Sequence, residues 1–163
     1  MREILKTKGQ KMRKILFLAL MLVGFAFAEG KPKIELHQSP YCGCCGMWVK
    51  YMQNKGYTLE VRKYSDFYKL KDELGIKNEF QSCHTGLVEG YAVEGHVPAD
   101  AVEWLLHEKP KGVIGIAVPG MPMGSPGMEQ GGEDEEYPVV IMFKDGSHKI
   151  YGTYKGHKLI KKG

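Results

Sequence analysis

Several signatures of common enzymes are missing from this sequence of 163 residues. It has no glycine-rich phosphate-binding loop, no serine, histidine and aspartate set in a hydrolase order, and no pair of carboxylates typical of acid–base catalysis. It also has no internal repeat and no sign of a second domain. These absences direct attention to the few residues that carry other chemistry, above all the four cysteines.

An excess of positive charge is also missing once the N-terminal segment is set apart. The whole chain has 23 Lys and Arg against 19 Asp and Glu, but six of these basic residues and one acidic residue lie within residues 1–28. The remaining 135 residues therefore carry 17 basic and 18 acidic side chains, a net charge of about −1 with His neutral. This balance gives no reason to expect a nucleic-acid partner, and the length fits one domain with a core of its own.

Residues 1–28 have the pattern of a secretory signal peptide. A basic segment up to Lys14 precedes the apolar run Ile15–Phe27, and Ala26-Phe27-Ala28 resembles a cleavage site. The apolar run is shorter than the ~20 residues that span a bilayer comfortably, and no basic stop-transfer cluster follows it. We therefore predict export, cleavage after Ala28, no stable membrane insertion afterwards, and a single mature domain over residues 29–163. The cleavage site has no cysteine, which argues against a lipoprotein.

The rest of the chain alternates between strand and helix patterns, which predicts an α/β fold with a mixed central sheet, flanking helices and a C-terminal β-hairpin. The first part has the order β-α-β-α, for which a right-handed crossover and a parallel strand pair are expected. Ser65 is expected to cap the second helix, and the basic tail after Gly156 is expected to be frayed. Strands are predicted over 33–38, 58–64, 87–93, 113–118, 139–143 and 148–154, and helices over 46–54, 65–75 and from 99 to Pro110.

Three of the four cysteines, Cys42, Cys44 and Cys45, fall within four residues between the first predicted strand and the first predicted helix. Export favours disulfides, and four cysteines allow three pairings, which the sequence leaves open. A framework of structural disulfides would rarely group three cysteines so closely. The clustering therefore favours metal binding or catalysis, with Cys83 and the adjacent His84 as the expected partners in space.

A thiol at a helix N-terminus has a lowered pKa and readily becomes a thiolate. Cys42 and Cys45 form a C-x-x-C pair at a strand-to-helix turn, as in thioredoxin-like oxidoreductases. Cys44 adds little to a two-thiol redox couple but much to a polynuclear thiolate metal site. If a redox role applies, Pro98 or Pro119 is a candidate for the cis-proline that faces the active turn in such enzymes.

Thiolates select Cu(I), zinc or iron–sulfur clusters, and a zinc site with three cysteines and one histidine is chemically possible. The Gly/Pro-rich loop over residues 119–132 contains Met121, Met123 and Met128, and thioethers suit copper better than zinc. Such methionines can equally fill gaps in a core. Among the other histidines, His37 lies close enough to the cysteine turn to be a candidate, whereas His107, His148 and His157 are expected at the surface.

Four motifs occur along the chain in an order that a known family shares. They are Tyr41-Cys42-Gly43-Cys44-Cys45-Gly46-Met47-Trp48, then Ser82-Cys83-His84-Thr85, then Tyr91-x-x-Glu94-Gly95-His96-Val97-Pro98-Ala99, and finally the segment from Val118 to Glu129. In these motifs the chain resembles the exported copper-resistance protein family CopG, from about Ile34 to Tyr154. The resemblance implies a thioredoxin-like fold, a periplasmic location, and copper bound as a Cu(I)–thiolate cluster.

The resemblance carries the role of copper ligand to Cys42, Cys44, Cys45 and Cys83. His84, His96, Met121 and Met128 match motif positions and are candidate ligands. The sequence thus predicts a copper-binding protein for copper resistance or trafficking, with polynuclear Cu(I) as its metal. Copper ions and another periplasmic copper protein or exporter are the expected partners. The alternative is an oxidoreductase that uses Cys42 and Cys45 to act on disulfides or on copper, and a zinc-stabilised domain is a third interpretation.

Overall fold

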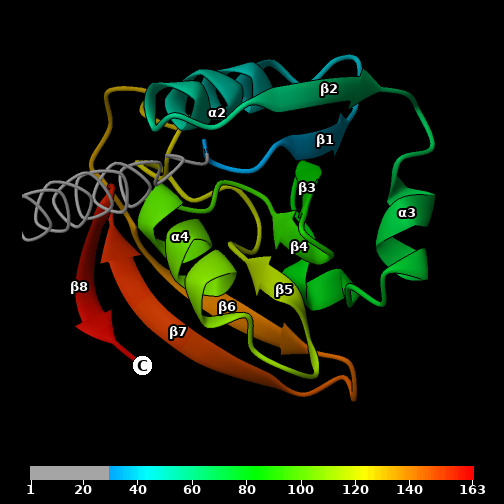
Figure 1. Ribbon diagram of the computed structural model, residues 1–163. Helices are drawn as coiled ribbons and strands as arrows, with labels where there is room; N and C mark the ends of the chain where they lie inside the picture. The colour runs from blue at the N-terminus through cyan, green and yellow to red at the C-terminus, as the bar shows by residue number, and fades with distance from the viewer. Residues whose placement is uncertain (1–29) are drawn as a thin grey trace, which may run out of the picture. The chain divides into compact units, whose positions relative to one another are not determined.

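Eight strands form one mixed sheet in the order β2-β1-β3-β4-β5-β6-β7-β8 in the computed structural model, which describes residues 30–163 (Figure 1). Residues Lys31–Gly163 make up one compact unit. The predicted α/β class with a mixed sheet is confirmed, whereas the predicted signal peptide lies outside the described residues. The strands are β1 Ile34–Gln38, β2 Leu59–Lys63, β3 His84–Val88, β4 Tyr91–Glu94, β5 Val113–Ala117, β6 Glu136–Phe143, β7 His148–Lys155 and β8 Lys158–Lys162. The helices are α2 Gly43–Asn54, α3 Tyr68–Glu73 and α4 Ala99–Glu108, with a short 3-10 helix η1 at Asn78–Phe80.

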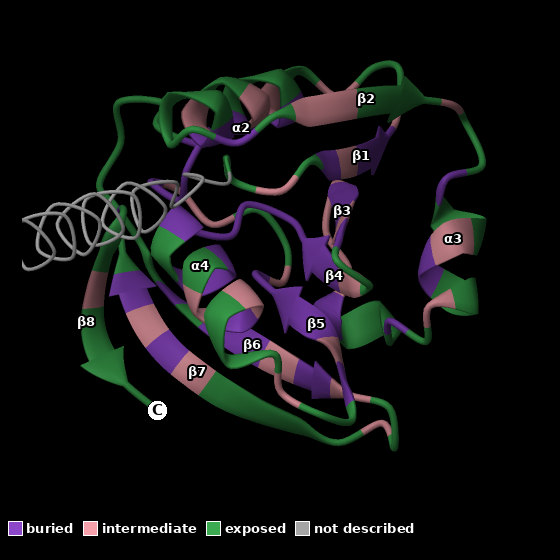
Figure 2. Cartoon of the chain, viewed as in Figure 1, coloured by how far each residue is buried: buried purple, intermediate pink, exposed green. Residues whose placement is uncertain are grey.

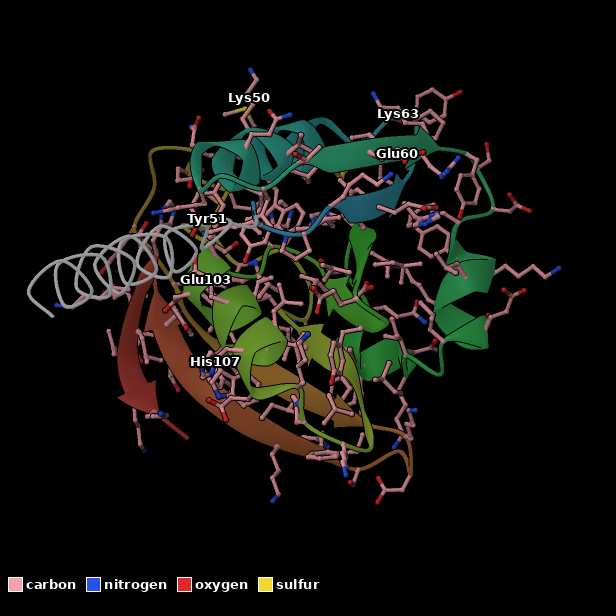
Figure 3. All side chains as sticks on the ribbon, in the orientation of Figure 1. Lys50, Tyr51, Glu60, Lys63, Glu103 and His107 are labelled. Carbon is pink, nitrogen blue, oxygen red and sulfur yellow. A yellow bond between two sulfur atoms is a disulfide. The ribbon has the colours of Figure 1, made fainter. Side chains whose placement is uncertain are left out.

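The first crossover has the expected form, since β1 and β2 are parallel neighbours joined through α2. Helix α2 buries Trp48 and Met52 completely, and Leu36 of β1 is also fully buried. Burying a large apolar side chain stabilises the fold by about 1.5–3 kcal/mol, so this contact fixes the helix against the sheet. In Figure 3 the Lys50 side chain points outward from α2, whereas Tyr51 lies on the side of the helix toward α4.

The predicted single strand over 87–93 is wrong, because the chain reverses within it. Strands β3 and β4 are antiparallel and are joined by the two-residue turn Glu89-Gly90. Both turn residues have positive φ, 46° and 82°, as a tight hairpin turn requires. Asn-Gly or Asp-Gly would have signalled this turn, whereas Glu is uncommon at its first position. The reversal matters because it brings the residues before β3 beside those after β4.

The second half of the sheet follows the predicted order. Helix α4 connects β4 to the parallel strand β5 and buries Val102 and Leu105 completely. Strands β6 and β7 form the expected hairpin, whose turn is closed by hydrogen bonds from the Ser147 backbone N–H and hydroxyl to the Asp145 carboxylate. In Figure 2 the buried residues concentrate in β3, β4 and β5, the middle of the sheet.

Two local predictions are wrong. The tail after Gly156 is not frayed: Lys158–Lys162 forms β8, which pairs antiparallel with β7 as an edge strand. Figure 2 shows that β8 is largely exposed, and lysines on an exposed edge discourage unwanted strand pairing. Ser65 does not cap α3, which begins at Tyr68 after Phe67 and has no side-chain cap. None of the helices in residues 30–163 has the length and hydropathy needed to span a membrane.

Candidate metal centre

The sheet brings all four cysteines to the end of β1. The Cys42 N–H donates to the Ser39 carbonyl, 3.3 Å away, in the turn after β1. Helix α2 then starts at Gly43, three residues earlier than predicted, so that Cys44 and Cys45 belong to its first turn. On the neighbouring strand β3, His84 pairs with Gln38, the last residue of β1. Cys83 precedes His84 and therefore lies beside the cysteine turn.

The four sulfur atoms lie within 4.8 Å of one another. Cys42 and Cys45 form a disulfide with a Cα–Cα distance of 5.6 Å, whereas Cys44 and Cys83 are free thiols. The sulfur atoms of Cys42 and Cys44 are 3.5 Å apart, and Cys45 Sγ lies 3.7 Å from the Cys83 carbonyl oxygen. The structure therefore combines a C-x-x-C disulfide with two thiols at one point.

Two buried histidines complete the group on the side of Cys83. Cys83 Sγ lies 3.2 Å from His84 Nδ1 and 3.0 Å from His96 Nε2, and each of the three residues offers one potential ligand atom within 4.8 Å of the other two. His96 Nδ1 is 2.8 Å from the Pro126 carbonyl oxygen, which can only accept. His96 must therefore carry its proton on Nδ1, which leaves the Nε2 lone pair directed at the cysteine. A second hydrogen bond of this kind is typical of histidines that bind metals.

Burial sets the protonation states in this group. It raises the pKa of Cys83 to about 12, and the neighbouring Cys44 adds to the shift. Burial also lowers the pKa of His84 well below 6.5, helped by the nearby His96 and Lys71, and it lowers the pKa of His96. Both imidazoles are consequently neutral near pH 7, the form that binds metals, while the Cys83 thiol keeps its proton until something displaces it.

His84 has one further property that bears on ligand binding. Its ring lies against the indole of Trp48, with 4.7 Å between ring centroids, and its Nε2 atom is buried without a hydrogen-bond partner. A buried polar atom without a partner costs about 1–3 kcal/mol. The His84 side chain is thus held by packing against Trp48 and by the contact of its Nδ1 atom with Cys83 Sγ. Its other ring nitrogen has no hydrogen bond that would fix the ring.

The methionine loop packs over the same helix turn. Residues 124–128 are all buried. Gly127 approaches α2 so closely that an added Cβ would lie 2.5 Å from the backbone nitrogen of Trp48. Met128 is buried within this loop, with 6% of its surface exposed, whereas Met121 is 53% exposed. Met121 follows Gly120, whose carbonyl oxygen accepts a hydrogen bond from the Ser82 hydroxyl. The two predicted methionines therefore belong to a segment that contacts both sides of the cysteine group.

The remaining histidines have other neighbours. His37 Nδ1 lies 2.8 Å from the Tyr64 hydroxyl, and its Nε2 lies 3.1 Å from the Glu35 carboxylate. His107 is highly exposed, and His157 contacts the Glu129 carboxylate. Within residues 30–163, the groups of three or more potential His, Cys, Asp or Glu ligands are the two described above, and both contain Cys83.

Sequence reasoning missed a buried polar cluster directly behind the site. Lys71 of α3 and Glu94 of β4 form an ion pair with no exposed side-chain surface, and both contact Thr85. Lys71 follows Phe67 by one helical turn, so its place on the inward face of the helix was readable from the spacing. The suggestion of a cis-proline is wrong, because the described residues contain no cis peptide bond and Pro98 and Pro119 are therefore trans.

The fold and this site define an α/β protein with a cluster of potential soft metal ligands at a strand-to-helix turn. The sequence profile of a family described as protein of unknown function, DUF411, matches residues 80–128. A solved structure named copper resistance protein CopG, form 1, is 38% identical over 77% of this chain and 100% of its own, with a TM-score of 0.71. Form 2 of that protein is 37% identical over 76% of this chain and 98% of its own, also with a TM-score of 0.71.

The chain therefore belongs to the copper resistance protein CopG family. A search among curated proteins gave no significant match. The family membership confirms the resemblance drawn from the four motifs. Together with the cysteine group it supports metal binding in connection with copper resistance.

Proposed function

We propose that this protein binds Cu(I) as a polynuclear thiolate cluster in the periplasm and serves copper resistance or trafficking. The observation that carries the proposal is the convergence of four cysteine sulfur atoms within 4.8 Å. Thiolates are soft ligands and prefer Cu(I) over harder ions. The name of the two solved relatives, copper resistance protein CopG, favours copper over zinc, for which the same donor set is chemically possible.

The donor set fits such a cluster in number and placement. A single two-thiol couple needs only Cys42 and Cys45, and the structure adds two further thiols beside them. Cys83 belongs to both ligand groups, so it is the natural bridging ligand between the cysteine turn and the imidazoles of His84 and His96. The two histidines are neutral near pH 7, as metal ligands must be.

The scaffold we propose is thioredoxin-like. The segment from β1 to α4 has the order β-α-β-α-β-β-α, and its strands lie in the spatial order β2-β1-β3-β4. Within it β1 and β2 are parallel, and β3 is antiparallel to both of its neighbours. A C-x-x-C pair at the turn between the first strand and helix is the position used by thioredoxin-like proteins. The single mature domain would be this unit extended by β5 to β8.

Four thiolates require that the Cys42–Cys45 disulfide be opened. A dithiol reductant would supply the two electrons and two protons and become a disulfide itself, leaving two thiols here that lose their protons when copper binds. In this reduced state the site holds Cu(I) and withholds it from redox cycling. Release to a partner, such as another periplasmic copper protein or an exporter, would proceed by exchange of one ligand at a time. Met121, the more exposed of the two candidate thioethers, lies where an incoming ligand could reach it.

The proposal is tested by replacing Cys44 with Ser. This thiol is free and lies in the first turn of α2 without a disulfide partner, so its loss should leave the fold intact. We expect the reduced C44S protein to lose multi-copper binding while its circular dichroism spectrum stays that of the parent. An unchanged copper-to-protein ratio in C44S would contradict a cluster built on all four thiols.

One observation favours a second function, oxidation and reduction of thiols or of copper. The C-x-x-C cysteines form a disulfide at the start of a helix, which is the arrangement of a redox couple. In that case a substrate dithiol would transfer two electrons to the disulfide, opening it as the substrate becomes oxidised. Reductase activity that is lost in C42S but kept in C44S would establish this function, whereas loss of activity in neither variant would exclude it.

A further inference from the structure

A completely buried ion pair lies directly behind the proposed copper site. Lys71 reaches inward from α3, and its Nζ donates to the Glu94 carboxylate of β4, with neither side chain exposed. Removing two charges from water costs several kcal/mol per ion, and neutral residues of similar size often replace such pairs without loss of stability. Stability alone therefore gives little reason for this pair to be here.

The contacts of Glu94 indicate what the pair does. One carboxylate oxygen accepts a hydrogen bond from the Ser82 backbone N–H at 2.7 Å, and the other accepts from the Thr85 hydroxyl at 2.6 Å. Lys71 Nζ also donates to the Thr85 hydroxyl oxygen at 2.9 Å. Ser82 and Thr85 flank the candidate ligands Cys83 and His84. The Glu94 carboxylate is therefore hydrogen-bonded to the chain on both sides of these two residues.

The backbone of Glu94 extends the same connection to the other imidazole. The carbonyl oxygen of Glu94 accepts from the Val118 N–H, and the next N–H, of Gly95, donates to the His84 carbonyl oxygen, both at 2.9 Å. His96 follows one residue later. Glu94 therefore lies between the two chain segments that supply Cys83 and His96.

We propose that Lys71 and Glu94 are positioning residues of the copper site: Glu94 holds the segment 82–85 in place, and Lys71 holds Glu94. This inference rests on the proposed copper-binding function and deepens it. The hydrogen bond to Ser82 fixes the peptide from which Cys83 projects, and Lys71 supplies the positive charge that allows the carboxylate to remain ionised inside the protein. The pair thus fixes where the Cys83 sulfur lies relative to the other three.

Two double variants separate positioning from the loss of charge. K71M/E94Q and K71M/E94L both remove the ion pair and leave side chains of similar volume. Only the glutamine keeps a carbonyl oxygen that can accept from the Ser82 N–H, so the pair of variants isolates that contact. Loss of a buried hydrogen bond costs about 1–3 kcal/mol, which corresponds to roughly 5- to 150-fold in an equilibrium.

The first measurement uses reduced, copper-free protein and does not depend on metal binding. The alkylation rates of Cys83 and Cys44 are compared by mass spectrometry of peptides. In K71M/E94L we expect Cys83 to react about tenfold faster, relative to Cys44, than in K71M/E94Q, because the peptide before it is released. The second measurement is competition for Cu(I) with a chelator, in which K71M/E94L should bind about tenfold more weakly than K71M/E94Q.

Equal Cys83 reactivity and equal Cu(I) affinity in the two double variants would overturn the positioning role. If K71M/E94L fails to fold, E94D provides the same test, since it keeps the charge but shortens the side chain by one methylene. E94D should then also increase the relative Cys83 reactivity, and an unchanged rate would overturn the inference. If the parent protein binds no Cu(I), the proposed function fails, while the alkylation rates still decide whether Glu94 positions Cys83.

Discussion

Cys83 Sγ lies 3.0 Å from His96 Nε2 because the β3–β4 hairpin brings the residue before β3 close to those that follow β4. Thr85 pairs with Glu94 at this end of the hairpin, and Cys83 and His96 lie just beyond that pair, where the Gly95 N–H still donates to the His84 carbonyl oxygen. A shift of one residue would turn every side chain of a strand to the other face. The two-residue turn at the far end of the hairpin thus determines which ligands meet at the site.

Gly95 is a point where this arrangement should fail on substitution. Its φ is +75°, and an added Cβ would lie 2.5 Å from the Ser82 hydroxyl oxygen and 2.7 Å from the Val118 carbonyl oxygen. We expect G95A to lower the free energy of unfolding by about 2 kcal/mol or more, through strain and crowding together. Gly120 is a matched control, since its φ is +69° but nothing lies within 4 Å of its added Cβ. Urea unfolding should show a clearly larger loss for G95A, and equal losses would refute the crowding argument.

The methionine loop can be displaced from α2 by a single methyl group. In G127A the new Cβ would lie 2.5 Å from the backbone nitrogen of Trp48, so the loop must move away from α2. The Pro126 carbonyl, which orients His96 by a hydrogen bond, would move with the loop. We predict that G127A binds Cu(I) at least about fivefold more weakly. This corresponds to the loss of about 1 kcal/mol when the hydrogen bond between His96 and the Pro126 carbonyl is disturbed. Gly131, with a φ of +80° and open space around its Cβ, provides the control. Identical affinities in G127A and G131A would mean that the loop does not contribute to binding.

The stability of the copper-free protein should fall as the pH is lowered from 7.5 to 5. Burial lowers the pKa of His84 and His96, so below the unfolded value of about 6.5 the unfolded chain takes up protons that the folded chain excludes. Each group contributes at most about 1.4 kcal/mol per pH unit in this range. The raised pKa of Glu94 acts in the opposite direction, since the folded protein then binds a proton that the unfolded chain has released.

The role of His84 in this pH dependence is measured by urea unfolding across that range. H84L should flatten the decline, because a leucine of similar size has no proton to gain. H107Q is the control, since the His107 side chain is 85% exposed and its loss should leave the slope unchanged. A slope in H84L equal to that of the parent would show that the buried imidazole is not its source.

Copper capacity should depend on the oxidation state of the C-x-x-C pair. With the Cys42–Cys45 disulfide closed, Cys44 and Cys83 are the thiols that remain. We expect oxidised protein to bind less copper than reduced protein. A thiol reductant added to the oxidised protein should restore the full copper capacity. The variant C42S/C45S cannot form this disulfide. It should bind the same smaller amount of copper under oxidising and under reducing conditions. Equal copper capacity of the oxidised and reduced parent would contradict the four-thiol site.

Much of the scaffold was predictable because its signals are local. The alternation of Ile34 and Leu36 indicated β1, and the apolar spacing around Trp48 and Met52 indicated α2. The cysteine turn was recognisable because three thiols in four residues rarely serve structure alone. These features depend on residues that are close in sequence, where periodicity and turn chemistry are informative.

The parts that could not be predicted depend on contacts between distant residues. The Glu89-Gly90 turn lacks the usual Asn or Asp, so the pairing of β3 with β4 had no clear local signal. Strand β8 is rich in lysine and forms only because β7 offers an open edge. The spacing from Phe67 places Lys71 on the inward face of α3, but its partner Glu94, which supplies the counter-charge, lies 23 residues later and had no local signal. The disulfide partner of Cys42 likewise required the geometry of the turn, since the sequence allowed three pairings.

The most direct test of the proposed function is the metal content of the reduced protein. Purified under reducing conditions, the parent and C44S are analysed for copper and zinc per chain, and the copper K-edge spectrum reports the oxidation state. A cluster on Cys42, Cys44, Cys45 and Cys83 predicts more than one copper per chain in the parent, present as Cu(I), and a lower ratio in C44S. Zinc in place of copper, or at most one copper per chain in both proteins, would contradict it.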